Sequence, residues 1–206
     1  MKMKLTLAHG VHQQSLQAHL ATIFASQSVP TRIRTFSQCT SIPSSPSISI
    51  EMPSCLRECS GKALMDFIKQ NDIEENVRII HALAHIEFNA FTAYAHTLFH
   101  FHDKIQPESR SEFAAEMRRV SADEGRHCLM LIDRLKGLGY DYGDLPVISS
   151  LTKIIQETQD DLLSRIGLIS LVHEGQGRRA VKRLIKKLES LRDLESAAIL
   201  KTIEEE

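Results

Sequence analysis

A glutamate and a histidine three residues apart constrain the fold of this chain more than any other feature of its sequence. Glu124 and His127 lie within the segment SADEGRHCLMLIDRL, Ser121–Leu135. Residues three apart on a helix lie on the same face, one turn along. The other positions around that face are apolar or weakly polar: Met117, Val120, Cys128, Leu131 and Leu135. A carboxylate and an imidazole are costly to bury there unpaired.

A metal ion would remove that cost, because it binds a deprotonated carboxylate and a neutral imidazole. Dinuclear sites in four-helix bundles are built from Glu-x-x-His on two helices and a single glutamate on each of the other two. Taken alone, the Glu124–His127 pair is equally compatible with a buried ion pair or a partly exposed helix pair. The metal interpretation therefore requires three further helices with suitable ligands.

The composition favours a helical protein. The chain has 206 residues, enough for one substantial domain, and 42% of them are hydrophobic. Leu, Ile, Ala, Glu, Lys and Arg are plentiful, which favours helices. The net charge of -1 argues against a broad nucleic-acid surface. No apolar run approaches the roughly 20 residues that a membrane span needs, so no membrane partner is expected.

The four cysteines are too sparse for a disulfide framework, which indicates a reducing compartment. Cys55 and Cys59 have the spacing of a metal or redox pair, but no second pair accompanies them at zinc spacing. We therefore interpret them as free thiols and expect a cytoplasmic protein.

Residues 1–60 differ from the rest of the chain. They contain no Asp or Glu before Glu51, four of the six prolines, and dense serine after Ser37. Such a segment has few means of burying itself, so we predict an irregular N-terminal arm over 1–60 and a helical domain over 61–206. The basic, serine-rich start also resembles an organelle transit peptide, which makes a mitochondrion or another organelle the alternative location.

The first long helix is predicted over 75–101, which contains no glycine or proline. The neighbours of Glu87 on its face are all apolar or aromatic: Ile80, Leu83, Ala84, Ala90, Phe91 and Tyr94. Glu87 is therefore either a metal ligand or part of a buried hydrogen-bond network. His81 and His85 have a zinc-compatible spacing, but no glutamate directly follows His81. We interpret them as helix-surface histidines or as groups that orient a ligand.

Three more helices are predicted, at 109–136, 150–174 and 179–206, the last with a bend near 191–193. Glycines follow the second helix and lie beside Glu174 in the third, where they indicate helix ends. Glu174 is thus a ligand or an exposed helix-end residue. Glu206 falls where a carboxylate of the fourth helix would lie, but no histidine follows it three residues later.

Three blocks of this sequence together resemble an uncharacterised ferritin-like family. The blocks are HALAHIEFNA (81–90), ADEGRHCLMLIDRLKGLGYDYGDLP (122–146) and DLLSRIGLISLVHEGQG (161–177). The resemblance spans about residues 60–206 and does not include the N-terminal arm. The family looks like a relative of di-iron carboxylate proteins, which include a tRNA-hydroxylating branch. The fourth-helix histidine of that family is missing here, so the chain is expected to be truncated at its C-terminus.

The resemblance implies an all-α protein with an antiparallel four-helix bundle and one or two iron or manganese ions. It implies these metal ligands: Glu87, Glu124, His127, Glu174 and, in the fourth-helix position, Glu206. A catalytic protein of this kind would be an oxidoreductase or hydroxylase, and the resemblance leaves open a small-molecule or tRNA substrate and a homo-oligomer. The alternatives are a non-catalytic metal-binding protein and a degenerate helical interaction module.

Overall fold

The protein is helical wherever its structure is described. The computed structural model describes residues 28–39, 53–148 and 151–206, and among these the side chains of all but 151–152 and 171–179. The helices are α2 (Val29–Gln38), α3 (Gly61–Gln70), α4 (Glu75–Phe101), α5 (Arg110–Gly137), α6 (Leu151–Glu157), α7 (Leu162–Ser190) and α8 (Leu194–Glu205), with 3-10 turns at His102–Lys104 and Pro107–Ser109. The β-pairing seen within the described ranges is one isolated parallel bridge between Glu58 and Val147. The all-α prediction is confirmed.

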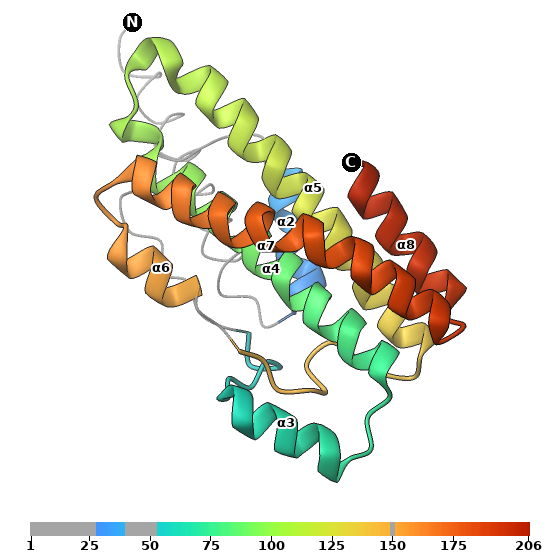
Figure 1. Ribbon diagram of the computed structural model, residues 1–206. Coiled ribbons are helices and arrows are strands. Elements are labelled where there is room, and N and C mark those ends of the chain that lie inside the picture. The colour runs from blue at the N-terminus through green and yellow to red at the C-terminus, as the bar shows by residue number, and fades with distance from the viewer. Residues whose placement is uncertain (1–27, 40–52, 149–150) are drawn as a thin grey trace, which may run out of the picture.

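The antiparallel helices α4 and α5 form the centre of the molecule (Figure 1). Their observed bounds agree with the predicted 75–101 and 109–136 to within a residue. Helix α5 ends where its glycines predict: Gly139 adopts φ +84°, and the N–H of Tyr140 donates to the carbonyl of Leu135 at 3.0 Å. The loop that follows α5 then passes over the first half of α4, where Gly143 and Tyr142 contact His81 and His85.

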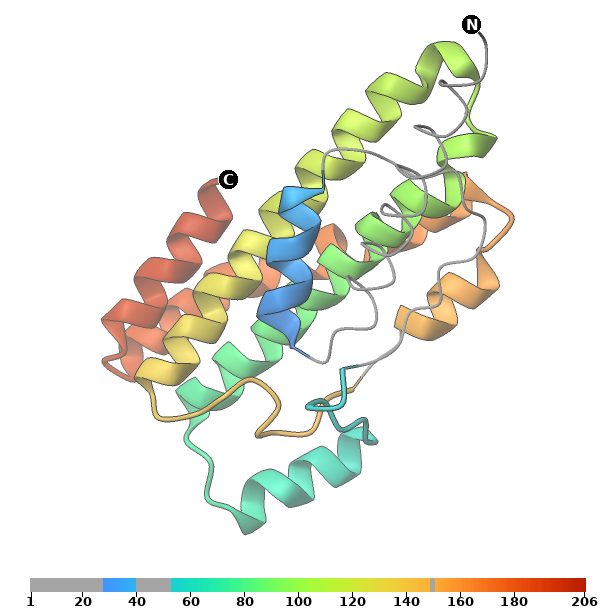
Figure 2. The same ribbon diagram turned by 180° about the vertical axis from the view of Figure 1, so that it is seen from behind.

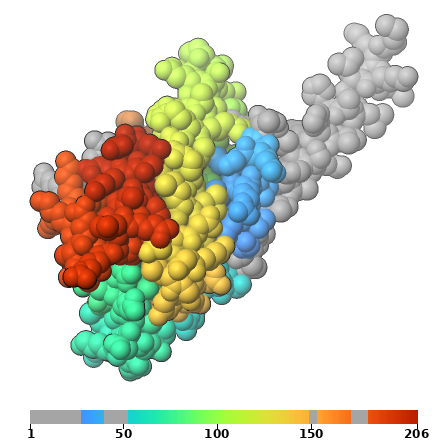
Figure 3. Space-filling view, turned by 90° about the vertical axis from the view of Figure 1, so that its right-hand side faces the viewer, coloured from blue at the N-terminus to red at the C-terminus, as the bar shows by residue number. Residues whose placement is uncertain are grey.

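Helices α7 and α8 form a second antiparallel pair that lies along the first (Figure 1). Helix α7 packs on α4, and α8 packs on α5. Figure 3 shows α8 on one side of α5 and α2 on the other. None of the helices in the described ranges is long and apolar enough to cross a membrane.

The predicted bounds of the third and fourth helices are wrong. The chain breaks after Glu157, because the side chain of Asp161 caps a new helix by accepting from the N–H of Ser164 at 3.1 Å. Helix α7 then runs through the glycines near Glu174 without interruption. Glycine costs a helix only about 1 kcal/mol, and buried residues on both sides of the glycines, Ile169 and Leu188, hold α7 against the core.

The bend predicted near 191–193 is a full reversal of the chain. Arg192 has a left-handed φ of 61°, and the N–H of Asp193 donates to the carbonyl of Leu188 at 2.9 Å. The carboxylate of Asp193 then caps α8 by accepting from the N–H of Ser196 at 3.0 Å. As a result α8 runs back along α7 and not onward from it (Figure 1).

The prediction of an irregular arm is wrong for residues 29–38, which form α2. Figure 2 shows α2 lying across α4 and α5, on the side opposite α7. Its residues Val29, Ile33 and Phe36 are 1%, 2% and 2% exposed. They recur at i, i+4 and i+7, so one face of this short helix is apolar. Residues 1–27 and 40–52 of the predicted arm lie outside the described part of the chain.

Candidate metal centre

The central helix pair brings Glu87, Glu124 and His127 together. Glu87 lies in the middle of α4, and the other two lie one turn apart in the middle of α5. Nδ1 of His127 is 3.8 Å from Oε2 of Glu87 and 3.9 Å from Oε2 of Glu124. One potential ligand atom of each residue lies within 4.8 Å of those of the other two. We refer to these three residues as the Glu87–Glu124–His127 cluster.

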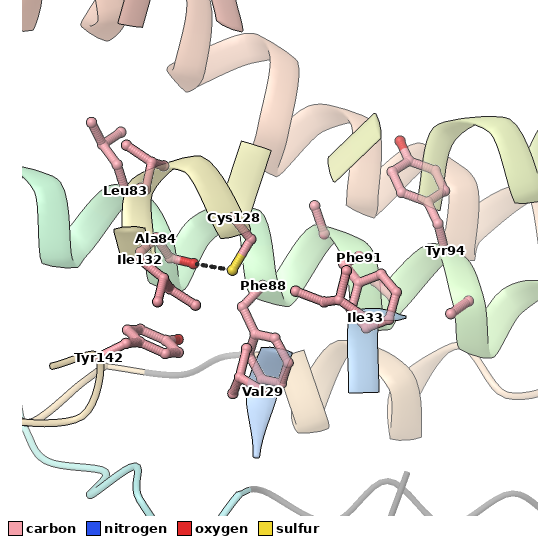
Figure 4. Packing of buried hydrophobic residues seen from close by; sticks show 14 of the residues in the cluster. Val29, Ile33, Leu83, Ala84, Phe88, Phe91, Tyr94, Cys128, Ile132 and Tyr142 are labelled. Carbon is pink, nitrogen blue, oxygen red and sulfur yellow. Dashed lines mark hydrogen bonds between the residues drawn. The ribbon is translucent and has the colours of Figure 1, made fainter. Parts of the chain in front are cut away.

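The cluster is largely shielded from solvent. The side chains of Glu87, Glu124 and His127 are 12%, 21% and 8% exposed. Beside them, Cys128 is fully buried and its thiol donates to the carbonyl of Ala84 at 3.5 Å (Figure 4). This contact joins α4 and α5 next to the cluster. The buried residues around it, Ala84 and Phe88 on α4 and Cys128 and Ile132 on α5, form an apolar seam between the two helices.

Gly125 allows α2 to approach α5 within the Glu-x-x-His segment itself. A Cβ atom at this position would lie 2.8 Å from Cγ2 of Ile33 and 3.3 Å from Cδ2 of Phe91. Figure 4 shows Ile33 and Phe91 packed together near the cluster-bearing helices. The buried face of α2 thus supports the segment that presents Glu124 and His127.

Together, burial and mutual contact raise the proton affinities of both Glu87 and His127. Burial, with a smaller contribution from the neighbouring Glu124, raises the pKa of Glu87 to about 7 against the opposing effect of His127. Burial also lowers the pKa of His127, but its interactions with the surrounding glutamates outweigh this and raise the pKa to about 10. The cluster therefore attracts positive charge, whether a proton or a cation.

Glu206 reaches the same histidine from the other side of its ring. Its Oε2 is 2.9 Å from Nε2 of His127 and 2.5 Å from a terminal nitrogen of Arg126. These two contacts lower the pKa of Glu206. Because Nδ1 faces the cluster, Glu206 contacts the ring nitrogen that points away from it. The role predicted for Glu206 as a ligand remains a prediction.

The start of α8 is tied to α5 by Arg134, which explains why α8 leads Glu206 to His127. The guanidinium of Arg134 donates to Asp193 at 2.8 Å, to Ser196 at 2.8 Å and to Glu195 at 2.7 Å. Arg134 lies two turns along α5 from His127, and the twelve-residue α8 runs back from this anchor. Sequence reasoning missed both Arg134 and Arg126. Their partners Asp193 and Glu206 lie far along the chain, so no local spacing links them.

Glu174, the remaining predicted ligand, lies on α7, but its side chain is outside the described residues. The same holds for His173. Their relation to the Glu87–Glu124–His127 cluster stays a prediction, and so does the second ion that would depend on Glu174.

His81 and His85 do not lie on the surface of α4, as one interpretation of their spacing had it. His81 accepts from the backbone N–H of Gly143 at 3.1 Å. His85 contacts the Tyr142 hydroxyl through Nδ1 at 2.8 Å and the Asn89 amide through Nε2 at 3.2 Å. Both rings are buried, which lowers their pKa values to about 4. They fasten the loop after α5 to α4, and the hydrogen-bond partners described above do not belong to the cluster.

The four cysteines all lie in the described ranges and are thiols outside any disulfide, as predicted for Cys55 and Cys59. Cys39 and Cys128 are buried. Burial raises the pKa of the Cys128 thiol well above its ordinary value, and the charge of Glu87 adds to this. Cys128 is therefore a packing residue beside the cluster in its thiol form.

Comparison with known proteins agrees with an uncharacterised family. A protein of Haemophilus influenzae described as "Uncharacterized protein" is 32% identical over 126 residues, which cover 60% of this chain and 44% of that protein. The alignment thus spans less than half of the relative's length. No solved structure matches this chain significantly.

The profile of one family, described as "Protein of unknown function (DUF455)", matches residues 2–206. The match begins near the first residue, so the expectation that residues 1–60 lie outside the family is wrong. The predicted membership of an uncharacterised family is confirmed. This chain belongs to the DUF455 family of proteins of unknown function.

Proposed function

We propose that this chain is a ferritin-like, four-helix metalloprotein that binds iron or manganese through Glu87, Glu124 and His127. The observation that carries the proposal is the convergence of these three side chains inside the central helix pair. The placement of α4, α5, α8 and α7, each packed on the next and α7 packed on α4, supports the four-helix arrangement. Ligands from facing helices of such a bundle meet in its interior.

The distances within the cluster suit one ion. Two ligand atoms that each lie about 2.1 Å from a small divalent ion are at most about 4.2 Å apart. The separations of Nδ1 of His127 from Glu87 and Glu124, 3.8 and 3.9 Å, fall below that limit. Small rotations of the two glutamate side chains bring the remaining pair within it, since all three atoms lie within 4.8 Å.

The charges of the cluster also suit a cation. Without one, the buried carboxylate of Glu87 holds a proton up to a pH of about 7. A divalent ion would take the place of that proton and of the proton on Nδ1 of His127, and would compensate the carboxylates of both glutamates. A carboxylate-rich set with one imidazole favours iron or manganese over softer ions, although zinc can also enter.

Within this proposal the chain's own residues have distinct tasks. Glu87 and Glu124 supply oxygen ligands from opposite helices, and His127 supplies Nδ1. A bound iron ion would supply redox chemistry, which would make the protein an oxidoreductase or hydroxylase. The apolar seam around Cys128 restricts water on the α4–α5 side. The substrate class is left open, and non-catalytic metal binding is the alternative.

Metal titration tests the proposal. The protein is titrated anaerobically with Fe²⁺ and, separately, with Mn²⁺, and metal is counted per chain after desalting. We expect one tightly bound ion. Glu87→Gln, Glu124→Gln and His127→Gln should each weaken binding by more than the roughly 10- to 100-fold typical of losing an outer partner of a ligand. Glu112→Gln, an exposed change on the same helix, is the matched control.

Two outcomes would decide against parts of the proposal. If the wild-type chain binds no ion, or if the three variants bind like the control, the cluster is a buried ion pair and the interaction-module alternative gains. If the ion binds but the iron-loaded protein consumes no dioxygen when supplied with a reductant, metal binding stands without the oxidoreductase activity.

A further inference from the structure

His127 presents its two ring nitrogens to two different sets of carboxylates. Nδ1 faces Glu87 and Glu124, at 3.8 and 3.9 Å. Nε2 faces Glu206, at 2.9 Å. Only the second distance is that of a direct hydrogen bond. A neutral imidazole has one N–H and one bare nitrogen. A partner that accepts a hydrogen bond from the Nε2–H therefore leaves Nδ1 as the nitrogen that can bind an ion.

Arg126 holds the Glu206 carboxylate in place. It contacts Oε2 of Glu206 at 2.5 Å through one terminal nitrogen and Oδ1 of Asp123 at 3.2 Å through the other. Asp123 in turn contacts Arg119 at 3.3 Å. Glu206 is thus one member of a chain of charged contacts along the outer side of α5. Arg126 directly precedes His127 in α5, so the residue that holds Glu206 and the proposed ligand lie on the same helix turn.

We propose that Glu206 is a positioning residue for the metal site: its carboxylate accepts the Nε2–H of His127 and so leaves Nδ1, turned toward Glu87 and Glu124, as the nitrogen that gives up its proton to an ion. This inference rests on the proposed function, and it differs from the sequence-based prediction that Glu206 is itself a ligand. An outer carboxylate fixes the tautomer and orientation of a ligating imidazole and raises its basicity.

A graded set of variants tests the inference. Glu206→Ala removes the acceptor, whereas Glu206→Gln keeps a neutral acceptor oxygen that accepts a weaker hydrogen bond. The control is Glu205→Ala, which removes an equal charge from the exposed neighbouring position. Each protein is titrated with Mn²⁺, and thermal unfolding of the metal-free forms is followed by circular dichroism. Zn²⁺-loaded protein with ¹⁵N-labelled histidine reports which His127 nitrogen carries the proton and how fast that proton exchanges.

We expect the Mn²⁺ affinity to fall about 10- to 100-fold in Glu206→Ala, to fall less in Glu206→Gln and to stay unchanged in Glu205→Ala. A role confined to holding the end of α8 would not produce this order without a matching loss of thermal stability. The Nε2 proton should be present in the loaded wild-type chain and should exchange faster with water in Glu206→Ala.

Three results would overturn the inference. One is a Glu206→Ala chain that binds Mn²⁺ like Glu205→Ala, and another is a metal-bound Nε2 in the loaded protein. The third is a Glu206→Ala chain that loses its ion altogether, which would make Glu206 a ligand. A wild-type chain that binds no metal, or binds it independently of His127, refutes the proposed function instead, and His127→Gln distinguishes that case.

Discussion

Replacing Gly125 by alanine tests whether the N-terminal helix supports the Glu-x-x-His segment. The added Cβ would lie 2.8 Å from Cγ2 of Ile33 and 3.3 Å from Cδ2 of Phe91. Those two residues are only 2% and 1% exposed. Neither side chain has open space to retreat into, so the new methyl group must displace α2, α4 or both.

The expected effect follows from two opposing contributions. Overpacking a core by a methyl group costs about 1–3 kcal/mol, whereas alanine is favoured over glycine within a helix by about 1 kcal/mol. Gly167→Ala is the matched control, because Gly167 lies in α7 and a Cβ there would meet none of the described residues within 4 Å. That variant should be about 1 kcal/mol more stable than wild type. Gly125→Ala should be about 1–3 kcal/mol less stable than the control variant.

A double-mutant cycle with Ile33→Ala isolates the contact. Removing this buried side chain alone should cost about 2–5 kcal/mol. It also removes Cγ2, the atom that the new methyl group would meet. In the Ile33→Ala background, Gly125→Ala should therefore lose most of its penalty, giving an interaction energy of about 1–3 kcal/mol. The free energy of unfolding is measured by urea denaturation followed by far-UV circular dichroism.

Additive effects in this cycle would refute the reasoning. So would a Gly125→Ala variant that is stabilised as much as Gly167→Ala. Either result would mean that α2 does not pack on α5 at Gly125, and that residues 29–38 belong to a loosely attached arm after all.

Two further predictions concern the contacts that hold the loops and α8 in place. Burial holds the pKa values of His81 and His85 at about 4, below the ordinary 6.5. The stabilisation that comes from these two neutral, buried rings is therefore complete above pH 6.5 and is lost as the pH falls toward 4. The free energy of unfolding falls by at most about 3 kcal/mol for each histidine. Urea denaturation should show that the free energy of unfolding falls less between pH 7 and pH 5 in His81→Gln and His85→Gln than in the wild-type chain. Equal falls in the variants and the wild type would contradict this prediction. Arg134→Met leaves the Asp193 carboxylate, 5% exposed, without its cation, which should destabilise the chain by about 3–5 kcal/mol; Lys136→Met, an exposed change on the same helix, should cost little.

The sequence alone determined α4, α5 and the cluster between them. Both helices are long, amphipathic or apolar segments bounded by acidic starts or glycine ends, and such local periodicity survives in any tertiary context. Glu87 and the Glu124–His127 pair stood out because each interrupts an apolar helix face. A polar side chain in that position must find a partner, so the pattern predicted their burial and their meeting.

The tertiary structure decided the remaining helices. The glycines beside Glu174 looked like a helix end, yet α7 continues, because buried residues on both sides of them hold it to α4 at little local cost. The turn that caps a new helix at Asp161 depends on two hydrogen bonds that its side chain accepts from Ser164, which no periodicity reveals. Helix α2 has only one apolar face of three residues within a Ser- and Pro-rich stretch, and its stability comes from α4 and α5.

The partners of His127 were likewise determined partly by the local sequence and partly by the tertiary structure. Its spacing from Glu124 made it a candidate ligand, since residues three apart on one helix share a face. Which ring nitrogen faces that ligand set depends on Glu206, 79 residues along the chain. Glu206 arrives there because the chain reverses at Asp193 and Arg134 ties the start of α8 to α5. Contacts of that range arise only when separate helices pack, and for that reason sequence spacing could not assign them.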